Sequence, residues 1–164
     1  AGYTGVLLGA TAVPLWARNA LRLGPLFLCS ALSSAAAALS LLLGSRAETA
    51  RARHAVERVE RLALVGEIAL LEAVRLGSGP VIGRPLAEGL AGGAFAGARA
   101  SAMGALALHL LAAVSPRWLG RALRLVASLL ALGGAFLLRS SIVFGGHRSA
   151  EDPDATFEFT RASR

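Results

Sequence analysis

The chain has 164 residues, of which 55% are apolar, a mean hydropathy of +0.60 and a net charge of +7. An ordinary soluble domain of this size is excluded, because four apolar stretches each have about the 20 residues that cross a lipid bilayer as a helix. The single cysteine, Cys29, excludes a disulfide within the chain, and with three scattered histidines it predicts no metal or haem site.

The first apolar segment, residues 1–13, covers only about 20 Å as a helix, which is too short to cross a bilayer. It has no basic region followed by a cleavage site, so a signal peptide is a poor interpretation. We expect residues 1–13 to be the C-terminal half of a helix whose first half precedes the sequence. A short re-entrant or interfacial segment is the alternative. Pro14 is expected to end this helix, and Trp16 is expected at the headgroup boundary.

Four complete helices are predicted after this segment, and they cover residues 24–44, 56–76, 86–114 and 118–145. The charged connection 45–58 is expected to wind into the second of them, because its Ala-Arg-Ala-Glu sequences favour helix. The polar residues 146–164 form a tail that is solvent-exposed, partly disordered or packed on a partner subunit. The prediction is therefore an all-α, polytopic transmembrane helix bundle over residues 1–145, followed by a polar C-terminal tail over residues 146–164.

Alternation of the helices gives the bundle two ends. The connections 14–23 and 77–85 and the tail share the X end, and the connections 45–58 and 114–118 share the Y end. More of the arginines flank the helices at the Y end, which favours the Y end as cytoplasmic. All 17 basic residues are arginine, and most lie in these connections, where lipid headgroups rather than nucleic acid are the expected partner.

Ionisable residues inside the apolar stretches are costly unless they are paired or hydrated, so each is a candidate functional residue. The candidates for buried ion pairs or proton handling are Glu67, Glu72, Arg99, His109 and Arg139. Depth along antiparallel helices predicts a Glu67–Arg99 pair near the bilayer midplane and Glu60 as the partner of His109. It also predicts a second cluster of Glu72, Glu88 and Arg139 near the X end. These groups either only neutralise one another or line a proton path or the wall of a quinone or substrate cavity.

Small residues recur at every fourth position in residues 86–114, at Gly89, Gly93, Gly97 and Ser101. Such a row lets a neighbouring backbone approach closely, so it predicts tight helix packing. Motifs of nucleotide-binding loops, nucleophile elbows and CxxC sites are absent from the sequence, and the catalytic and cofactor-binding residues are unassigned.

Two outer segments resemble the membrane subunits of the NrfD/polysulfide reductase family. The first comprises Tyr3-Thr4-Gly5-Val6-Leu7-Leu8, Pro14-Leu15-Trp16 and the run from Pro25 to Ser34. The second runs from Gly133 to Gly146. The resemblance keeps the order of these segments and corresponds to the C-terminal half of the family. Within it Arg139 is the best-matched charged residue and Tyr3 the best-matched polar one, which we expect near mid-bilayer in a helix-packing role.

This resemblance implies a membrane subunit of a bacterial respiratory oxidoreductase complex, located in the cytoplasmic (inner) membrane. Such a subunit anchors a ferredoxin-like iron–sulfur subunit, often with a molybdopterin subunit, and couples electron transfer to menaquinone or ubiquinone. The quinone pocket of relatives lies largely in the N-terminal bundle, so the subunit is either non-catalytic or quinone-reactive, and its site is expected mostly outside these residues. The alternative is half of a transporter or channel that uses the buried charges to bind a substrate or an ion.

Overall fold

The computed structural model describes residues 2–43 and 50–162, which form helices and connecting loops without a β-strand. The predicted all-α class is confirmed. The α-helices are α1 (Gly2–Gly9), α2 (Pro14–Arg18), α3 (Ala20–Leu43), α4 (Ala50–Gly77), α5 (Gly89–Val114), α6 (Arg117–Glu151) and α7 (Pro153–Ala162), with a short 3-10 helix, η2 (Arg84–Leu86), before α5.

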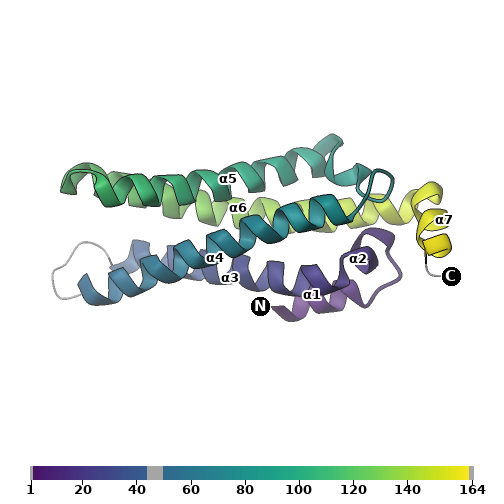
Figure 1. The fold of residues 1–164 in the computed structure, drawn as a ribbon, viewed down its shortest axis with the longest axis horizontal. Coiled ribbons are helices and arrows are strands. Elements are labelled where there is room, and N and C mark those ends of the chain that lie inside the picture. Colours follow the sequence, from purple (N-terminus) through teal and green to yellow (C-terminus); the bar gives the residue numbers. More distant parts are fainter. Residues whose placement is uncertain (1, 44–49, 163–164) are drawn as a thin grey trace.

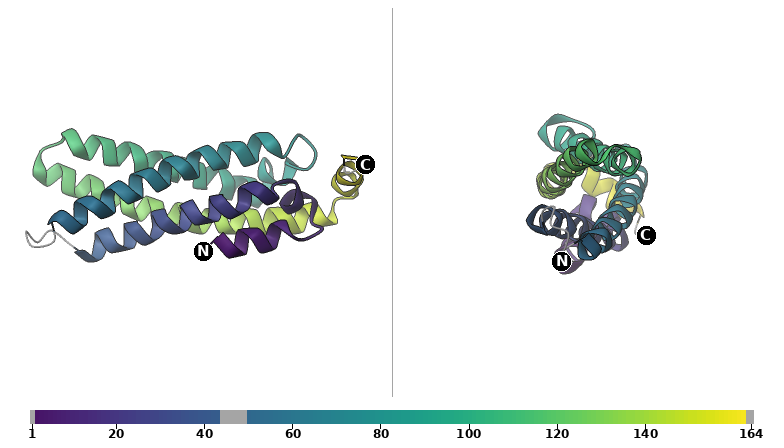
Figure 2. Two further views of the ribbon diagram at one scale, coloured as in Figure 1. Left: turned by 60° about the horizontal axis from the view of Figure 1, so that its bottom comes forward. Right: turned by 90° about the vertical axis from the view of Figure 1, so that its left-hand side faces the viewer.

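The four long helices α3, α4, α5 and α6 lie antiparallel in one bundle (Figure 1). The helices α5 and α6 pack most extensively, α4 packs mainly on α3, and the contact between α4 and α5 is thinner. Viewed along the bundle, the four helices lie around a common axis (Figure 2). The X end carries α2, η2 and α7, and the Y end carries the turn between α5 and α6, so the ends alternate as predicted.

Three of these helices, α3, α5 and α6, are long and apolar enough to cross a membrane. The helix α4 also has sufficient length, with 28 residues, but it carries more charge than the others. The chain therefore has three candidate spans among its described residues, and the predicted count of four complete spans rests on α4.

The helix ends differ from the predicted ones where packing or capping overrides local sequence. Pro14 does not close the first helix, which ends at Gly9; it opens α2, where its missing N–H is harmless. The helix predicted over 24–44 begins earlier, at Ala20, and α4 begins at Ala50, as expected for the end of the charged connection. Residues 44–49, with Arg46 and Glu48, lie outside the described residues.

The C-terminal tail is folded rather than extended. The helix α6 has 35 residues and continues past Gly145 to Glu151, and α7 follows directly. Ala155 of α7 is fully buried in the core of the same chain. Residues 146–161 are thus helical apart from the break at Asp152, and most of them are exposed as expected, while Gly146, Ser149 and Ala155 are buried against the bundle.

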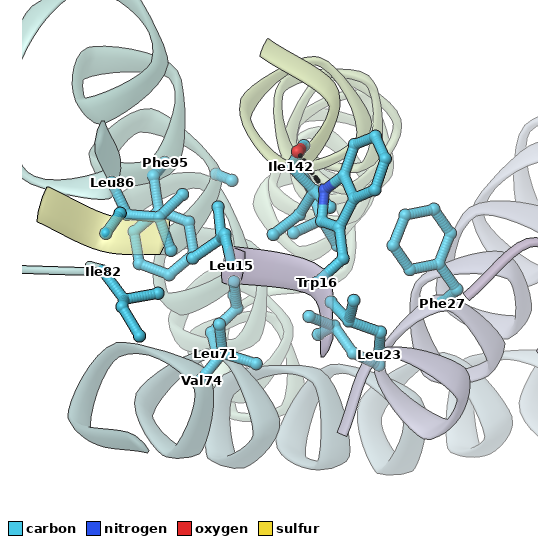
Figure 3. Close-up of a cluster of buried hydrophobic side chains, with 14 residues drawn as sticks. Leu15, Trp16, Leu23, Phe27, Leu71, Val74, Ile82, Leu86, Phe95 and Ile142 are labelled. Carbon is cyan, nitrogen blue, oxygen red and sulfur yellow. Dashed lines mark hydrogen bonds between the residues drawn. The ribbon is translucent and has the colours of Figure 1, made fainter. Parts of the chain in front are cut away.

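A core of large apolar side chains fills the X half of the bundle (Figure 3). Trp16 is 9% exposed in this core, and its indole N–H donates a hydrogen bond to the carbonyl oxygen of Ile142 at 2.8 Å. Trp16 was expected at the headgroup boundary, but α2 turns inward and places the ring against the helix backbone at Gly146. The two outer segments of the family resemblance therefore meet in this core.

The Y half of the bundle has a different core, made mostly of alanine. Ala37, Leu64, Ala102, Ala105, Ala127 and Ala131 are its buried members. Small side chains bring the helix backbones close and leave room for polar groups between them. The most deeply buried acidic and histidine side chains of the chain lie in this half.

Candidate functional site

Three glutamates lie on the core-facing stripe of α4. Glu57, Glu60 and Glu67 are only 6%, 0% and 3% exposed, although charged residues are rarely buried without partners. Their spacing of three and seven residues puts them on one side of a helix. The same stripe continues toward the X end with Leu71 and Val74, which are fully buried. Three of the seven buried residues of α4 are thus acidic, and each carboxylate needs a partner.

The three other long helices each contribute one residue to the environment of Glu60. The imidazole Nε2 of His109 on α5 lies 3.1 Å from Oε1 of Glu60. The hydroxyls of Ser40 on α3 and Ser128 on α6 each donate to this carboxylate at 3.3 Å. We call Ser40, Glu60, His109 and Ser128 the His109 cluster. The structure brings together the two residues, Glu60 and His109, that depth along the helices had paired.

His109 retains hydrogen-bonding capacity that the described residues do not use. It is 2% exposed, and neither ring nitrogen has a hydrogen bond of acceptable geometry within the described ranges. Nε2 lies at ion-pair distance from Glu60 but is not aligned for a hydrogen bond, and Nδ1 has no partner. A buried nitrogen without a partner is costly, so this ring marks a place for water, a proton or a ligand.

The His109 cluster opens toward the Y end. A cavity of about 90 Å³ next to it is lined by Ser40, Glu57, His109 and Arg124 among others. Glu57 at this cavity lies 3.7 Å from Arg53, 3.4 Å from Arg124 and 3.9 Å from His54. The cavity is large enough to hold water and leads from the buried ring to charged residues at the end of the bundle.

A second polar cluster lies deeper in the bundle, around Glu67. The hydroxyl of Ser33 on α3 donates to Oε2 of Glu67 at 2.8 Å. Arg139 on α6 interacts electrostatically with this carboxylate, and it donates to the carbonyl oxygen of Ala135 at 2.8 Å and to the hydroxyl of Ser30 at 3.5 Å. Arg139, not Arg99, is therefore the positive charge near Glu67.

Arg99 pairs with Glu72 instead. Its Nε lies 2.6 Å from Oε1 of Glu72, and Arg75 lies 2.8 Å from the other carboxylate oxygen. Both members of the Glu72–Arg99 pair remain about one third exposed. The expected cluster of Glu72, Glu88 and Arg139 does not form, because Glu88 is an exposed residue at the start of α5 and Arg139 lies with Glu67.

Glu67 and Arg99 have other partners than predicted for a simple reason. Counting residues gives the depth of a side chain along its helix but not the neighbouring helix toward which it points. Glu67 and Arg99 lie at similar depths, about 15 Å from the X ends of α4 and α5. However, α4 packs mainly on α3, so the inward stripe of α4 meets the serines of α3. Glu72 lies on the flank of α4, from which it reaches Arg99 on α5.

The predicted row of small residues on α5 contacts α6 over part of its length. A Cβ added at Gly97 would lie 3.0 Å from Leu137, and one added at Gly134 of α6 would lie 2.9 Å from Cβ of Ser101. Gly93 has open space beside it, and Gly89 is exposed with a φ of +64° at the start of α5. Close approach of the two helices therefore involves Gly97 and Ser101 but not Gly93, and at Gly89 an added Cβ would lie 2.8 Å from the flexible guanidinium of Arg148 on α6.

The serine partners of the acidic residues were not predicted, although a signal for them exists. Ser33 and Ser40 are seven residues apart on α3, and Glu60 and Glu67 are seven residues apart on α4. In an antiparallel pair of helices the two spacings match, so Ser33 meets Glu67 and Ser40 meets Glu60.

Tyr3, expected to be buried, is 72% exposed on the surface of α1.

Three cavities lined by described residues differ from a typical quinone site in size or in lining. Quinone-sized ligands occupy largely apolar pockets of roughly 300–1,000 Å³. The cavity beside His109 is smaller than that, at about 90 Å³. Two larger cavities, of about 410 and 450 Å³, lie at the Y and X ends and each has at least three arginines in its lining. Within the described residues no group of three His, Cys, Asp or Glu side chains is placed to hold a metal ion.

Comparison with known proteins identifies a protein family that the chain matches. The family model described as polysulfide reductase, of the NrfD type, matches residues 1–151. No curated protein and no solved structure matches the chain. The matched range contains all of the long helices. It also contains the His109 cluster, the polar cluster around Glu67 and the Glu72–Arg99 pair.

Proposed function

Because the chain belongs to the NrfD-type polysulfide reductase family, we propose that it is an integral membrane subunit of a bacterial respiratory oxidoreductase complex. In this proposal it anchors a ferredoxin-like iron–sulfur subunit, and in some complexes a molybdopterin subunit, and links their electron transfer to the quinone pool. The family match over residues 1–151 carries the proposal. Three apolar helices of spanning length agree with a multi-pass membrane protein.

We further propose that α4 is a fourth crossing. Its 28 residues correspond to about 42 Å of helix, which exceeds the roughly 30 Å of a bilayer core. Its acidic residues Glu57, Glu60 and Glu67 point into the bundle, so they do not meet lipid. Leu62, Val65 and Leu76 are exposed on its outer surface, as expected for a helix that faces acyl chains.

The cofactor of this complex is menaquinone or ubiquinone, and it binds mostly outside these residues, because the three cavities described above differ from a typical quinone site in size or in lining. The role of the bundle is to support the hydrophilic partners and to carry buried groups that exchange protons. Glu67, Glu72, Arg99, His109 and Arg139 are the candidate residues for proton handling. His109 and Glu60 are supported best, because an unused ring nitrogen lies beside a cavity that leads to the Y end.

The arginines favour one orientation in the bacterial cytoplasmic membrane. Arg51, Arg53, Arg58, Arg61, Arg117, Arg121 and Arg124 lie near the Y end, and fewer arginines lie near the X end. Arginine-rich ends of transmembrane helices remain in the cytoplasm. We therefore propose that the Y end is cytoplasmic.

The proposal is tested by purification of the full-length protein from its native membrane in mild detergent. Co-purifying subunits are identified by mass spectrometry, and iron and molybdenum are measured in the same sample. An iron–sulfur subunit with several iron atoms per complex is the expected result. A metal-free protein that purifies alone or as a homo-oligomer would contradict the proposal and favour the transporter alternative.

A further inference from the structure

A second cavity at the Y end has features that neither the family match nor the proposed redox role explains. It has a volume of about 410 Å³ and lies between α4, α5 and α6. We call it the Y-end cavity. Its lining includes Arg58, Arg61, Arg117 and Arg124, with Glu57 as the acidic member. The site therefore carries four positive charges against one negative charge.

Most of this positive charge is not neutralised by the protein. Glu57 already interacts with Arg124 at 3.4 Å and with Arg53 at 3.7 Å. Within the described part of the chain, neither Arg58, Arg61 nor Arg117 lies within 4.0 Å of a carboxylate oxygen. Three converging guanidinium groups without counter-ions favour an anion, and phosphate oxygens match the donor fork of arginine.

The N-terminus of α6 adds to the attraction for an anion. The helix begins at Arg117 after Pro116, and no side chain caps its first turn. Ser115, Arg117 and Gly120 of this turn line the Y-end cavity. Free N–H groups and the positive end of the dipole of a long helix stabilise negative charge.

A buried polar group at the wall of the cavity also lacks a partner. His109 lines the Y-end cavity, is 2% exposed, and has no hydrogen-bond partner for Nδ1 among the described residues. A ligand oxygen in the cavity would satisfy this nitrogen. The orphaned imidazole, the unneutralised arginines and the uncapped helix are three separate observations at one place.

We propose that the Y-end cavity binds the phosphate group of an anionic phospholipid. Apolar side chains that flank the lining residues in sequence point outward, namely Val114 at 84% and Trp118 at 74% exposed. They provide a surface for acyl chains beside the phosphate, and tryptophan favours the membrane interface. A free phosphate ion would have no use for this apolar rim. Basic pockets between transmembrane helices are suited to such headgroups. The inference requires only that the bundle lies in a membrane and does not depend on electron transfer.

The test uses the full-length protein, delipidated in mild detergent, and follows its thermal unfolding. Phosphatidylglycerol, phosphatidylcholine and inorganic phosphate are titrated separately. The variant Arg61→Gln with Arg117→Gln removes two cavity arginines. The variant Arg51→Gln is the matched control, because Arg51 is an exposed arginine on α4 near the same end. It lines neither the Y-end cavity nor the smaller cavity beside the His109 cluster.

Phosphatidylglycerol is expected to raise the Tm of the wild-type protein and of Arg51→Gln with the same apparent affinity. In the double variant this affinity falls at least about tenfold, since two of the four arginines that attract the phosphate are lost. If the double variant responds to phosphatidylglycerol with the same apparent affinity as the wild-type protein, the proposed site is overturned. If phosphatidylcholine raises the Tm as much as phosphatidylglycerol does, the selectivity for anionic lipid is overturned. The same shift with inorganic phosphate alone overturns the assignment to lipid. If the double variant does not fold, the single variant Arg117→Gln with the same titrations decides.

Discussion

Burial separates the two best-defined carboxylates of α4 and leads to different consequences of their loss. Glu60 is fully buried and serves His109, Ser40 and Ser128 at once. Glu72 is about one third exposed, and its partner Arg99 can be hydrated when the pair is broken. Both residues are glutamates, so the difference in the stability lost on their removal depends on whether water can reach the partner that is left behind.

We predict that Glu60→Ala lowers the free energy of unfolding by about 2 kcal/mol or more, because the buried His109 and Ser128 and the half-buried Ser40 all lose their partner. Glu72→Ala lowers it by less than about 1 kcal/mol, as for a surface ion pair. Glu60→Gln falls between wild type and Glu60→Ala, since its single amide oxygen still accepts from one of the two serines, which donate to different carboxylate oxygens of Glu60. Unfolding in mixed detergent micelles measures all three, and equal losses for Glu60→Ala and Glu72→Ala would refute the burial argument.

Glycine is required at position 146 for a reason that the sequence alone does not show. A Cβ at Gly146 would overlap the indole of Trp16, which is held by its hydrogen bond to Ile142. Gly133 on the same helix has open space beside it.

We predict that Gly146→Ala lowers the free energy of unfolding by about 1–3 kcal/mol through overpacking. The matched variant Gly133→Ala is neutral or stabilises by up to about 1 kcal/mol, because alanine favours helix more than glycine does. The near-ultraviolet circular dichroism of Trp16 provides a second readout, and it should change only in Gly146→Ala. A neutral Gly146→Ala would show that α2 does not lie where the structure places it.

For single residues, the sequence was a better guide to which charged side chains lie inside the bundle than to the ion-pair partner of each one. Glu60 and His109 were paired correctly because both lie near the Y end of the bundle. Arg99 was assigned to the wrong glutamate, because the direction in which a side chain points depends on which helix packs on which. Matching the serine spacing on α3 to the glutamate spacing on α4 would have supplied that information for Glu67.

The status of α4 is the main question at the level of the elements. Its composition alone makes it a poorer candidate span than α3, α5 or α6. Three of its glutamates, Glu57, Glu60 and Glu67, are nevertheless buried in the core, whereas its exposed arginines Arg51, Arg58 and Arg75 lie nearer its two ends. A helix that buries its charged stripe between three apolar helices can cross a bilayer without exposing those charges.

We predict that the two ends of α4 lie on opposite sides of the membrane. In a Cys29→Ser background, single cysteines are introduced as Arg51→Cys and Pro80→Cys, both at exposed positions. A membrane-impermeant maleimide added to intact spheroplasts should label Pro80→Cys and leave Arg51→Cys unlabelled until the membrane is opened. Labelling of both cysteines from the same side would show that α4 does not cross, and the reverse pattern would invert the orientation.

Helix interiors could be predicted from the sequence, but several helix ends could not. Apolar runs and break residues located α3, α5 and α6, and the alanine-rich connection correctly indicated an early start for α4. The pair Gly145-Gly146 resembled a helix end. In the structure α6 continues through it, because the absence of side chains there accommodates Leu15 and Trp16 of α2. A long-range contact of this kind leaves no local pattern.

For the whole molecule, the two ends of the bundle differ in character. The X end is closed by α2, η2 and α7 over a core of large side chains, and Arg84 there lies 3.9 Å from Asp152. The Y end has an alanine-rich core, a buried histidine and an arginine-lined cavity. In the proposed function, the packed X end would support other subunits, and the polar Y end would exchange protons and bind a lipid headgroup.

The central claim is that this chain connects an iron–sulfur partner to quinone, and electron transfer between the two tests it most directly. The purified complex is reduced with dithionite, excess reductant is removed, and an oxidised menaquinone analogue is added. The electron paramagnetic resonance signals of the reduced clusters are then followed in time. The account predicts rapid loss of these signals in the complex and much slower loss in the isolated iron–sulfur subunit. Equal rates with and without the membrane subunit would contradict it.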